Sequence, residues 1–194
     1  MQRGPIRFNL SARMPLHARF FGTWRSRDIP VSMRRADTAE FTIHDAYSAL
    51  VTDPERNHQI ITDILEVVRA GRTPLVLTSR KEHLDRLLVG LSSIEHMITL
   101  KGGMGKKQPQ AAAEKLAFIP EGVPRVILAT GSYIGEGFDD SRLDTLCLTT
   151  MPISWRGTLQ QYVGRLHRIH DGKKVVRVYD YVDPHVPMLA RMYE

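Results

Sequence analysis

The sequence contains little cysteine and no long apolar run. Its single cysteine, Cys147, lies in the apolar stretch LCLTT, which excludes an intrachain disulfide and most metal sites built on cysteine. We expect Cys147 to be a small buried hydrophobe. No stretch approaches the roughly 18 consecutive apolar residues of a membrane span, and the N-terminus lacks the apolar core of a signal peptide. These absences predict a soluble, cytoplasmic protein without a membrane partner.

Charge is unevenly distributed along the 194 residues. Residues 1–36 hold eight arginines and one acidic residue, a local charge of +7, whereas the whole chain carries +6. An arginine-rich run can attract nucleic acid because it displaces counterions from the phosphates. The alternative is a solvated flank, or an arm that pairs with another domain, and the sequence leaves both open.

From about residue 44 onward, apolar runs alternate with helical patterns, which is typical of β/α units on a parallel sheet. Asp53 can cap a helix over 54–70 that Gly71 would end, and we expect its DPERN start to lie at the surface. A capping box of Ser79 and Glu82 predicts a second helix. Further helices are expected near 109–118, 159–170 and 186–193.

Five apolar runs predict the strands of one sheet, at 74–78, 96–100, 125–130, 143–150 and 173–182. Strands joined by helical crossovers favour an open, mainly parallel α/β sheet with helices on both faces. Residues 1–43 lack this rhythm and are expected to form an irregular, basic N-terminal segment or linker. The length suits one domain with appended segments, which places the domain at 44–194.

Ligands of such sheets bind just beyond the carboxyl ends of the strands. That rule directs attention to four stretches, at 79–80, 101–107, 130–140 and 151–158. The stretch KGGMGKK is not a Walker A loop, because Leu100 stands where its first glycine belongs and Lys107 where its serine or threonine belongs. It could still hold a phosphate through helix N-terminal amides together with Lys106 and Lys107, or it could be a solvated turn.

The stretch LQQYVGRLHRIH predicts a two-sided helix. Leu159, Val163 and Leu166 recur at helical spacing and should face the core, while a polar triad shares the opposite side with Gly164. That triad consists of Gln161, Arg165 and Arg168. Exposed arginines usually carry no function, and Gln161 could instead complete a capping box at the helix start.

Single residues elsewhere admit two interpretations. Trp155 could stack on a base or, more simply, anchor its own loop. His83, His167 and His170 have no ligand partners at a spacing that suits zinc. The glycines and acids of ATGSYIGEGFDD, residues 129–140, could approach a ligand closely or be ordinary turn residues.

Taken in order, these stretches resemble the second RecA-like domain of superfamily-two helicases. QYVGRLHR fits that family's motif VI, Q-x-x-G-R-x-x-R, at every defined position. ATGSYIGEGFD resembles motif V, and LVLTSRKEHLDRL resembles motif IV. The resemblance covers roughly residues 55–182, and within the group the chain looks most like bacterial DEAD/DEAH-type helicase-like proteins related to type III restriction subunits. It implies a RecA-like fold.

The resemblance also implies roles for individual residues. Arg165 and Arg168 would reach across a cleft to the γ-phosphate of ATP, with Arg168 as the arginine finger. Gln161 would lie beside that phosphate, and Asp139, Gly137 and Gly164 would lie at the nucleotide. The implied contacts to the nucleic-acid backbone are Thr130, Gly131, Ser79, Arg80, Gly102, Lys106 and Lys107.

Motif V departs from the family pattern in its length. It has one more residue between Thr130 and Gly137 than several relatives. The assignment of backbone contacts there could therefore shift by one position.

The loop that cradles ATP and Mg²⁺ in this family, and its acidic box, have no match in residues 1–194. In the family they belong to the first RecA-like domain, which would be the partner of this chain in the same full-length protein. The expectation is the C-terminal motor domain of an ATP-dependent nucleic-acid helicase or translocase, with DNA favoured, that is inactive by itself. The alternatives are a non-catalytic α/β module that binds nucleic acid or protein, and a Rossmann-like enzyme, which the lack of a G-x-G-x-x-G stretch after a strand disfavours.

Overall fold

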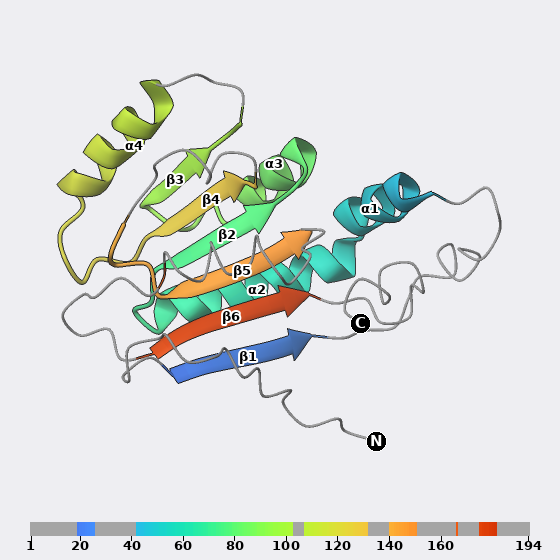
Figure 1. Cartoon of the computed structure of the whole chain (residues 1–194), viewed down its shortest axis with the longest axis horizontal. Helices are drawn as coiled ribbons and strands as arrows, with labels where there is room; N and C mark the ends of the chain where they lie inside the picture. The colour runs from blue at the N-terminus through green and yellow to red at the C-terminus, as the bar shows by residue number, and fades with distance from the viewer. Residues whose placement is uncertain are drawn as a thin grey trace, which may run out of the picture.

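A computed structural model describes residues 42–102, 107–131, 140–150, 166 and 175–181, together with the backbone of 19–25; of 107–109 it describes the backbone alone. Within these residues the chain forms one six-stranded sheet flanked by helices (Figure 1). The strands are β1 (Arg19–Arg25), β2 (Pro74–Thr78), β3 (Met97–Leu100), β4 (Val126–Thr130), β5 (Thr145–Thr150) and β6 (Val175–Tyr181).

Every strand pairing in the sheet is parallel, and the strand order is β1-β6-β5-β2-β4-β3. The carboxyl ends of all six strands therefore meet at one edge of the sheet, which we call the carboxyl edge. The α/β class and the five strands expected from the sequence are confirmed. The sheet gains a sixth strand from the segment before residue 44.

That sixth strand, β1, pairs with β6 in register from Arg19 opposite Val175 to Arg25 opposite Tyr181. The expectation that residues 1–43 are irregular is therefore wrong for this segment, where many arginines flank the short apolar run FFGTW. A second missed element is helix α1 (Ile43–Thr52). Its start carries a readable signal, since Thr42 and Asp45 form a capping box in which each side chain bonds the other residue's backbone amide.

Three more helices follow the chain: α2 (Pro54–Arg69), α3 (Lys81–Gly90) and α4 (Lys107–Phe118). Helix α2 begins as predicted, because the Asp53 side chain accepts the amide of Arg56 and Pro54 occupies the first turn. Gly71 follows it with a φ of 74°, a left-handed conformation that glycine adopts without strain. Among the described helices, none combines the length and the apolar content needed to cross a bilayer.

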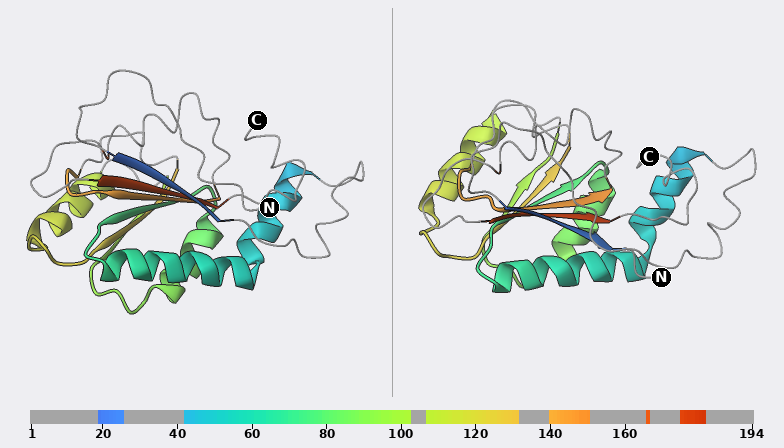
Figure 2. Two further views of the ribbon diagram at one scale, coloured as in Figure 1. Left: turned by 90° about the horizontal axis from the view of Figure 1, so that it is seen from below. Right: turned by 60° about the horizontal axis from the view of Figure 1, so that its bottom comes forward.

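Both faces of the sheet are buried, as expected for parallel strands. On one face, Ile60 and Ile64 of α2 and Leu84 and Leu87 of α3 pack against Val76 and its neighbours (Figure 2). On the other face, Leu116 of α4 and Leu166 pack against Leu75, Leu77, Leu146 and Leu148. Leu166 is fully buried and helical, which confirms that this residue faces the core, and Cys147 is buried as expected.

Arg72 joins the amino ends of three strands. Its Nε donates to the hydroxyl of Thr145 at 2.8 Å, and its Nη2 donates to the carbonyls of Asp144 and Val175 at 2.8 and 2.9 Å. The carbonyl of Asp144, just before β5, also accepts the amide of Arg177 on β6 at 2.9 Å. One guanidinium therefore adds hydrogen bonds to carbonyls at the start of both strands.

Replacing this guanidinium should destabilise the fold. We expect Arg72→Met to lower the free energy of unfolding by about 1–3 kcal/mol, because the Thr145 hydroxyl and two strand-end carbonyls each lose one hydrogen bond. The exposed Arg86 of α3 provides a matched control, and Arg86→Met should change stability by no more than about 0.5 kcal/mol. Urea unfolding followed by circular dichroism measures both, and equal losses would contradict the role given to Arg72.

Candidate functional site

A run of hydrogen bonds connects the ends of four neighbouring strands at the carboxyl edge. The amide of Gly102 after β3 donates to the hydroxyl of Thr130 on β4 at 2.8 Å. The amide of Gly131 donates to the carbonyl of Thr78 on β2 at 3.0 Å. The amide of Ser79 donates to the carbonyl of Thr150 on β5 at 3.2 Å. The described parts of three sequence-predicted stretches, 79–80, 101–102 and 130–131, are thus brought together.

The pairing of β2 with β5 is interrupted by a bulge at this edge. Leu77 lies opposite Leu148, but Thr78 lies opposite Thr150, so Thr149 is an extra residue. The hydroxyl of Thr149 donates to the carbonyl of Leu77 at 2.8 Å, and Arg56 Nη2 donates to the carbonyl of Thr149 at 2.6 Å. Side chains therefore replace the ladder bonds that a bulge removes.

His83 of α3 is buried against this bulge and has a defined tautomer. Asn57 Nδ2 donates to the carbonyl of Val51 at 2.8 Å, so Asn57 Oδ1 is the atom that faces His83 Nε2 at 2.9 Å. Because a carbonyl oxygen can only accept, Nε2 must carry the proton and Nδ1 must accept. The hydroxyls of Thr78 and Thr150 lie 3.1 and 3.2 Å from Nδ1 and supply the donor.

Burial keeps His83 neutral. Loss of hydration, together with the nearby charges of Arg56 on α2 and Arg86 on α3, lowers its pKa to about 3. A neutral imidazole that donates from Nε2 and accepts at Nδ1 is the form that both sides of this network require. His83 therefore acts as a fixed connector between α2 and the strand ends.

One expectation about this region is wrong, and another holds only in part. Ser79 does not cap α3: the N-cap is Arg80, which makes no side-chain cap bond, and the Ser79 hydroxyl donates instead to the carbonyl of Thr150 at 2.5 Å. In the DPERN start of α2, Pro54 and Glu55 are exposed as expected, but Asp53 and Arg56 are only 7% and 3% exposed. Strand β5, distant in sequence, provides the hydrogen-bond partner of both Ser79 and Arg56.

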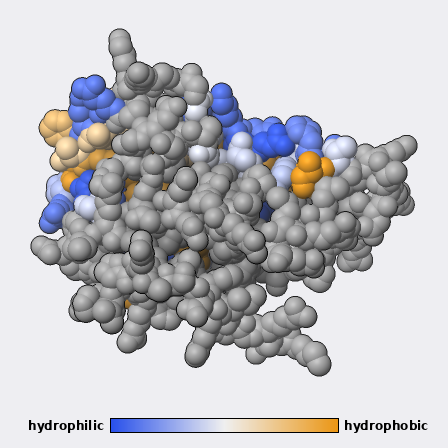
Figure 3. Space-filling view, in the orientation of Figure 1, coloured by the Kyte–Doolittle hydropathy of each residue, from blue (hydrophilic) through white to orange (hydrophobic). Residues whose placement is uncertain are grey.

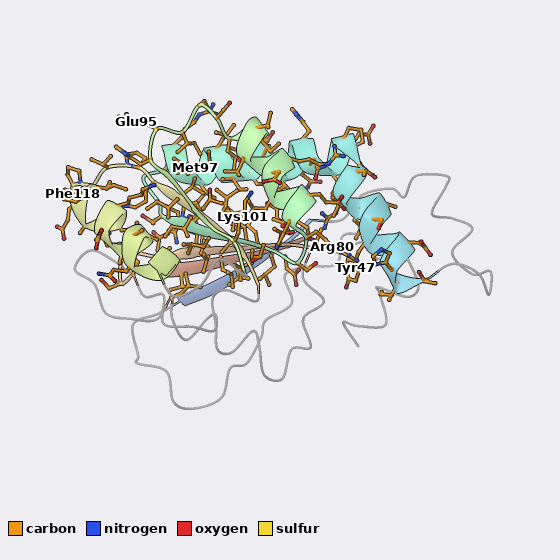
Figure 4. The ribbon with its side chains drawn as sticks, turned by 90° about the horizontal axis from the view of Figure 1, so that it is seen from above. Tyr47, Arg80, Glu95, Met97, Lys101 and Phe118 are labelled. Atoms are coloured by element: carbon orange, nitrogen blue, oxygen red, sulfur yellow. The ribbon has the colours of Figure 1, made fainter. Side chains whose placement is uncertain are left out.

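The side chain of Arg80 extends from the carboxyl edge toward α1. Its Nη2 lies 3.0 Å from Nδ1 of His44, and its guanidinium lies 6.0 Å from the ring centre of Tyr47 (Figure 4). Burial raises the pKa of Tyr47 to about 12, although the charge of Arg80 opposes this shift. Arg80 is half-buried, so part of its charge faces solvent at the end of the sheet.

Lys101, the residue after β3, also contributes charge to this edge. Its Nζ pairs with Asp85 of α3 at 2.6 Å. Much of the visible surface over α1 and α3 is hydrophilic (Figure 3). The described part of the edge therefore offers two partly exposed cations, Arg80 and Lys101, and the exposed residue Ser79.

The predicted nucleotide residues lie outside the described part of the chain. These are Gln161, Arg165, Arg168, Asp139, Gly137 and Gly164, and Lys106 is outside it as well; the side chain of Lys107 is not described. Within the described residues, no group of three or more histidines, cysteines and carboxylates is placed to hold a metal ion. Leu166, between the two arginines, is the one described residue of this helix.

Comparison with known proteins finds a relative encoded by a virus. The chain is 32% identical over 88 residues to the uncharacterized protein 108L of Invertebrate iridescent virus 3, and the match covers 45% of this chain and 77% of the viral protein. The chain belongs to the family of protein 108L. No protein-family model matches the chain. Because protein 108L is itself uncharacterized, membership of its family assigns no activity.

Solved structures share the fold at low sequence identity. T4 UvsW superposes with a TM-score of 0.65 at 16% identity over 86% of this chain, and the C-terminal part of the Fun30 ATPase domain with a TM-score of 0.55 at 16% identity over 69%. The matches span 33% and 45% of those two chains. The fold is therefore the RecA-like α/β fold, as the sequence resemblance implied.

The neutral state of His83 predicts a pH dependence of stability. In the unfolded chain His83 should titrate near its ordinary pKa of about 6.5, whereas in the folded chain its pKa is about 3. The contribution of neutral His83 to the free energy of unfolding is therefore fully present above about pH 6.5. It is lost as the pH decreases toward 3, by up to about 1.4 kcal/mol per pH unit. Urea unfolding at several pH values measures the slope, and His83→Gln should flatten it; an unchanged slope in that variant would contradict the assignment.

Proposed function

We propose that this chain is the C-terminal motor domain of an ATP-dependent nucleic-acid helicase or translocase, with DNA as the favoured substrate. The observation that carries the proposal is the hydrogen-bonded carboxyl edge, where the stretches 79–80, 101–102 and 130–131 lie together. In a parallel α/β sheet this edge is the place where ligands bind. The motif-like order of these stretches, followed by QYVGRLHR, supports the same conclusion.

The structural comparisons support the architecture of this proposal. Both T4 UvsW and the Fun30 ATPase domain share the fold, and the latter is named as an ATPase. Because the chain spans less than half of either neighbour, the activity of a whole motor, its ATP and Mg²⁺, and its first RecA-like domain are parts of the proposal. The finer relation to DEAD/DEAH-type proteins associated with type III restriction subunits is also proposed on sequence alone.

The hydrogen bonds at the carboxyl edge indicate which groups would contact a nucleic-acid backbone. The amides of Gly102 and Gly131 each donate within the protein, and the Thr130 hydroxyl accepts one of these bonds while remaining 4% exposed. The role of these residues would be to let a nucleic-acid strand approach the protein backbone closely. Direct bonds to phosphate would then come from the more exposed side chains of Ser79 and Arg80.

The proposed nucleotide chemistry depends on the helix that contains Leu166. Arg165 and Arg168 would stabilise the charge that develops on the transferred phosphoryl group, and Gln161 would lie beside it. Gly164 has no side chain and would let the nucleotide approach that side of the helix closely, while Gly137 and Asp139 would contact the nucleotide. Burial of Leu166 supports the orientation, because residues one before and two after it fall on other sides of a helix.

Binding of nucleic acid tests the backbone contacts directly. We expect Arg80→Ala to weaken binding of a single-stranded oligodeoxynucleotide several-fold. The slope of the logarithm of the binding constant against the logarithm of the salt concentration should also become less steep by about 0.7, the amount for one phosphate contact on a single strand. Arg69→Ala removes the same charge from the last turn of α2, at the other end of the domain, and is the control. Fluorescence anisotropy over a range of salt concentrations measures both. Equal effects of the two substitutions would show that Arg80 makes no specific contact with the nucleic acid.

Turnover of ATP tests the assignment as a motor domain. The 194-residue chain alone should show no measurable ATPase, because phosphoryl transfer also requires a phosphate loop and Mg²⁺. In a protein that also contains the first motor domain, Arg168→Ala should reduce nucleic-acid-stimulated turnover about 10³-fold or more without changing the circular dichroism spectrum. Arg69→Ala again serves as the control. Robust turnover by the chain alone, or retained turnover in the Arg168→Ala variant, would overturn the proposal. Nucleic-acid binding without ATPase in the protein that also contains the first motor domain would favour the non-catalytic module.

A further inference from the structure

The bulge in β5 needs a physical explanation, because bulges are rare between parallel strands. It makes Thr149 an extra residue and turns the hydroxyl of Thr150 toward Thr78, with 2.6 Å between the two oxygens. Thr150 is the last residue of β5. The bulge therefore sets the direction in which the chain leaves the sheet, and the residues that follow lead to Arg165 and Arg168.

The bulge is held by a side chain from a distant part of the sequence. Arg56, in the first turn of α2, is 3% exposed, and its Nη2 donates to the carbonyl of Thr149 at 2.6 Å and to the carbonyl of Tyr181 at 3.1 Å. A buried arginine carries a large desolvation cost, and an apolar residue usually fills such a position at least as well. The position is explained by the two carbonyls at the ends of β5 and β6, to which the guanidinium donates.

Ser79 connects the same point to the surface. Its amide and its hydroxyl both donate to the carbonyl of Thr150, at 3.2 and 2.5 Å. The Ser79 side chain is also exposed at the carboxyl edge. A hydroxyl has one hydrogen, so it can donate either to Thr150 or to a phosphate, but not to both.

We propose that Arg56 is a positioning residue that fixes the exit of the chain from β5, and that Ser79 couples this exit to nucleic-acid binding by exchanging Thr150 for a phosphate oxygen. This inference rests on the proposed function for the roles of the phosphate and of the arginines after Thr150. Arg56 and the threonine hydroxyls hold Thr149 and the side chain of Thr150 in place. The exchange at Ser79 therefore removes one of the two donors to the Thr150 carbonyl, directly before Met151, and leaves the sheet intact.

Trp155 provides a spectroscopic reporter, because it lies five residues after Thr150 and the only other tryptophan is Trp24. In a Trp24→Phe background, we expect Arg56→Met to shift the emission and the acrylamide quenching of Trp155. Arg72→Met is the matched control, since it removes an arginine that also donates to two strand-end carbonyls, but at the amino edge. It should leave the Trp155 signal unchanged although it also lowers stability. All spectra are taken where circular dichroism shows the variants folded.

A milder variant covers the case in which Arg56→Met does not fold. Thr149→Val keeps the side-chain volume and removes the bond to the Leu77 carbonyl, so it should shift the Trp155 signal in the same direction. If the Arg56 or Thr149 variant changes the signal no more than Arg72→Met does, the positioning role is wrong. This comparison needs no ligand, so it stands even if the proposed function fails.

The coupling is tested by titrating the Trp24→Phe chain with a single-stranded oligodeoxynucleotide. We expect saturation to change the Trp155 emission, and we expect Ser79→Ala to lose most of that change while its affinity, measured by anisotropy of a labelled oligonucleotide, falls less than about tenfold. Ser92→Ala, at an exposed serine after α3, is the control and should keep the full response. A full response in Ser79→Ala would overturn the coupling, whereas a parent chain that binds no nucleic acid would overturn the proposed function.

Discussion

The carbonyl groups at the ends of parallel strands need hydrogen-bond donors, and the arrangement of this domain follows from how they obtain them. Because all strands point the same way, their ends collect at two opposite edges, where ladder partners stop. Arg72 donates to carbonyls at the amino edge, and Arg56 donates to carbonyls at the carboxyl edge. Each guanidinium has several donors in a fixed plane, so one side chain can satisfy neighbouring strands.

The carboxyl edge combines a rigid inner layer with an accessible outer layer. The inner layer consists of His83 and the threonine hydroxyls, which are buried and fully paired with one another and with Asn57. The outer layer consists of Ser79, Arg80 and Lys101, which are exposed or half-buried themselves. Arg80 and Lys101 bond the exposed residues His44 and Asp85, while Ser79 bonds the carbonyl of Thr150. Bonds of the outer layer can be exchanged for ligand contacts without exposing an unpaired polar group in the core. This separation is what a binding edge on a stable sheet requires.

The sequence predicted the parts of the fold that local patterns determine. Apolar runs located five strands, and Asp53, Pro54 and Gly71 located the limits of α2 because caps and turns depend on adjacent residues. The pairing of β1 with β6 joins segments about 150 residues apart, which no local pattern encodes. The role of Ser79 was missed for the same reason, since a capping box and a bond to β5 use the same hydroxyl. Only the packed structure decides between them.

Arginines show most clearly where inference from sequence alone stops. Arg56 lies next to a helix cap in a polar stretch, and nothing in DPERN distinguishes it from an exposed residue. Its burial is dictated by the bulge of β5, which arises more than 90 residues later in the chain. The arginines of QYVGRLHR are the opposite case, because their spacing in the sequence marks them as a possible site although no local pattern marks Arg56. Between them lies Leu166, which is buried. An arginine that satisfies strand ends and one that serves a ligand are chemically identical, so the distinction depends on what surrounds the guanidinium. A shared fold does not assign the chemistry of the carboxyl edge, so that chemistry has to be assigned residue by residue.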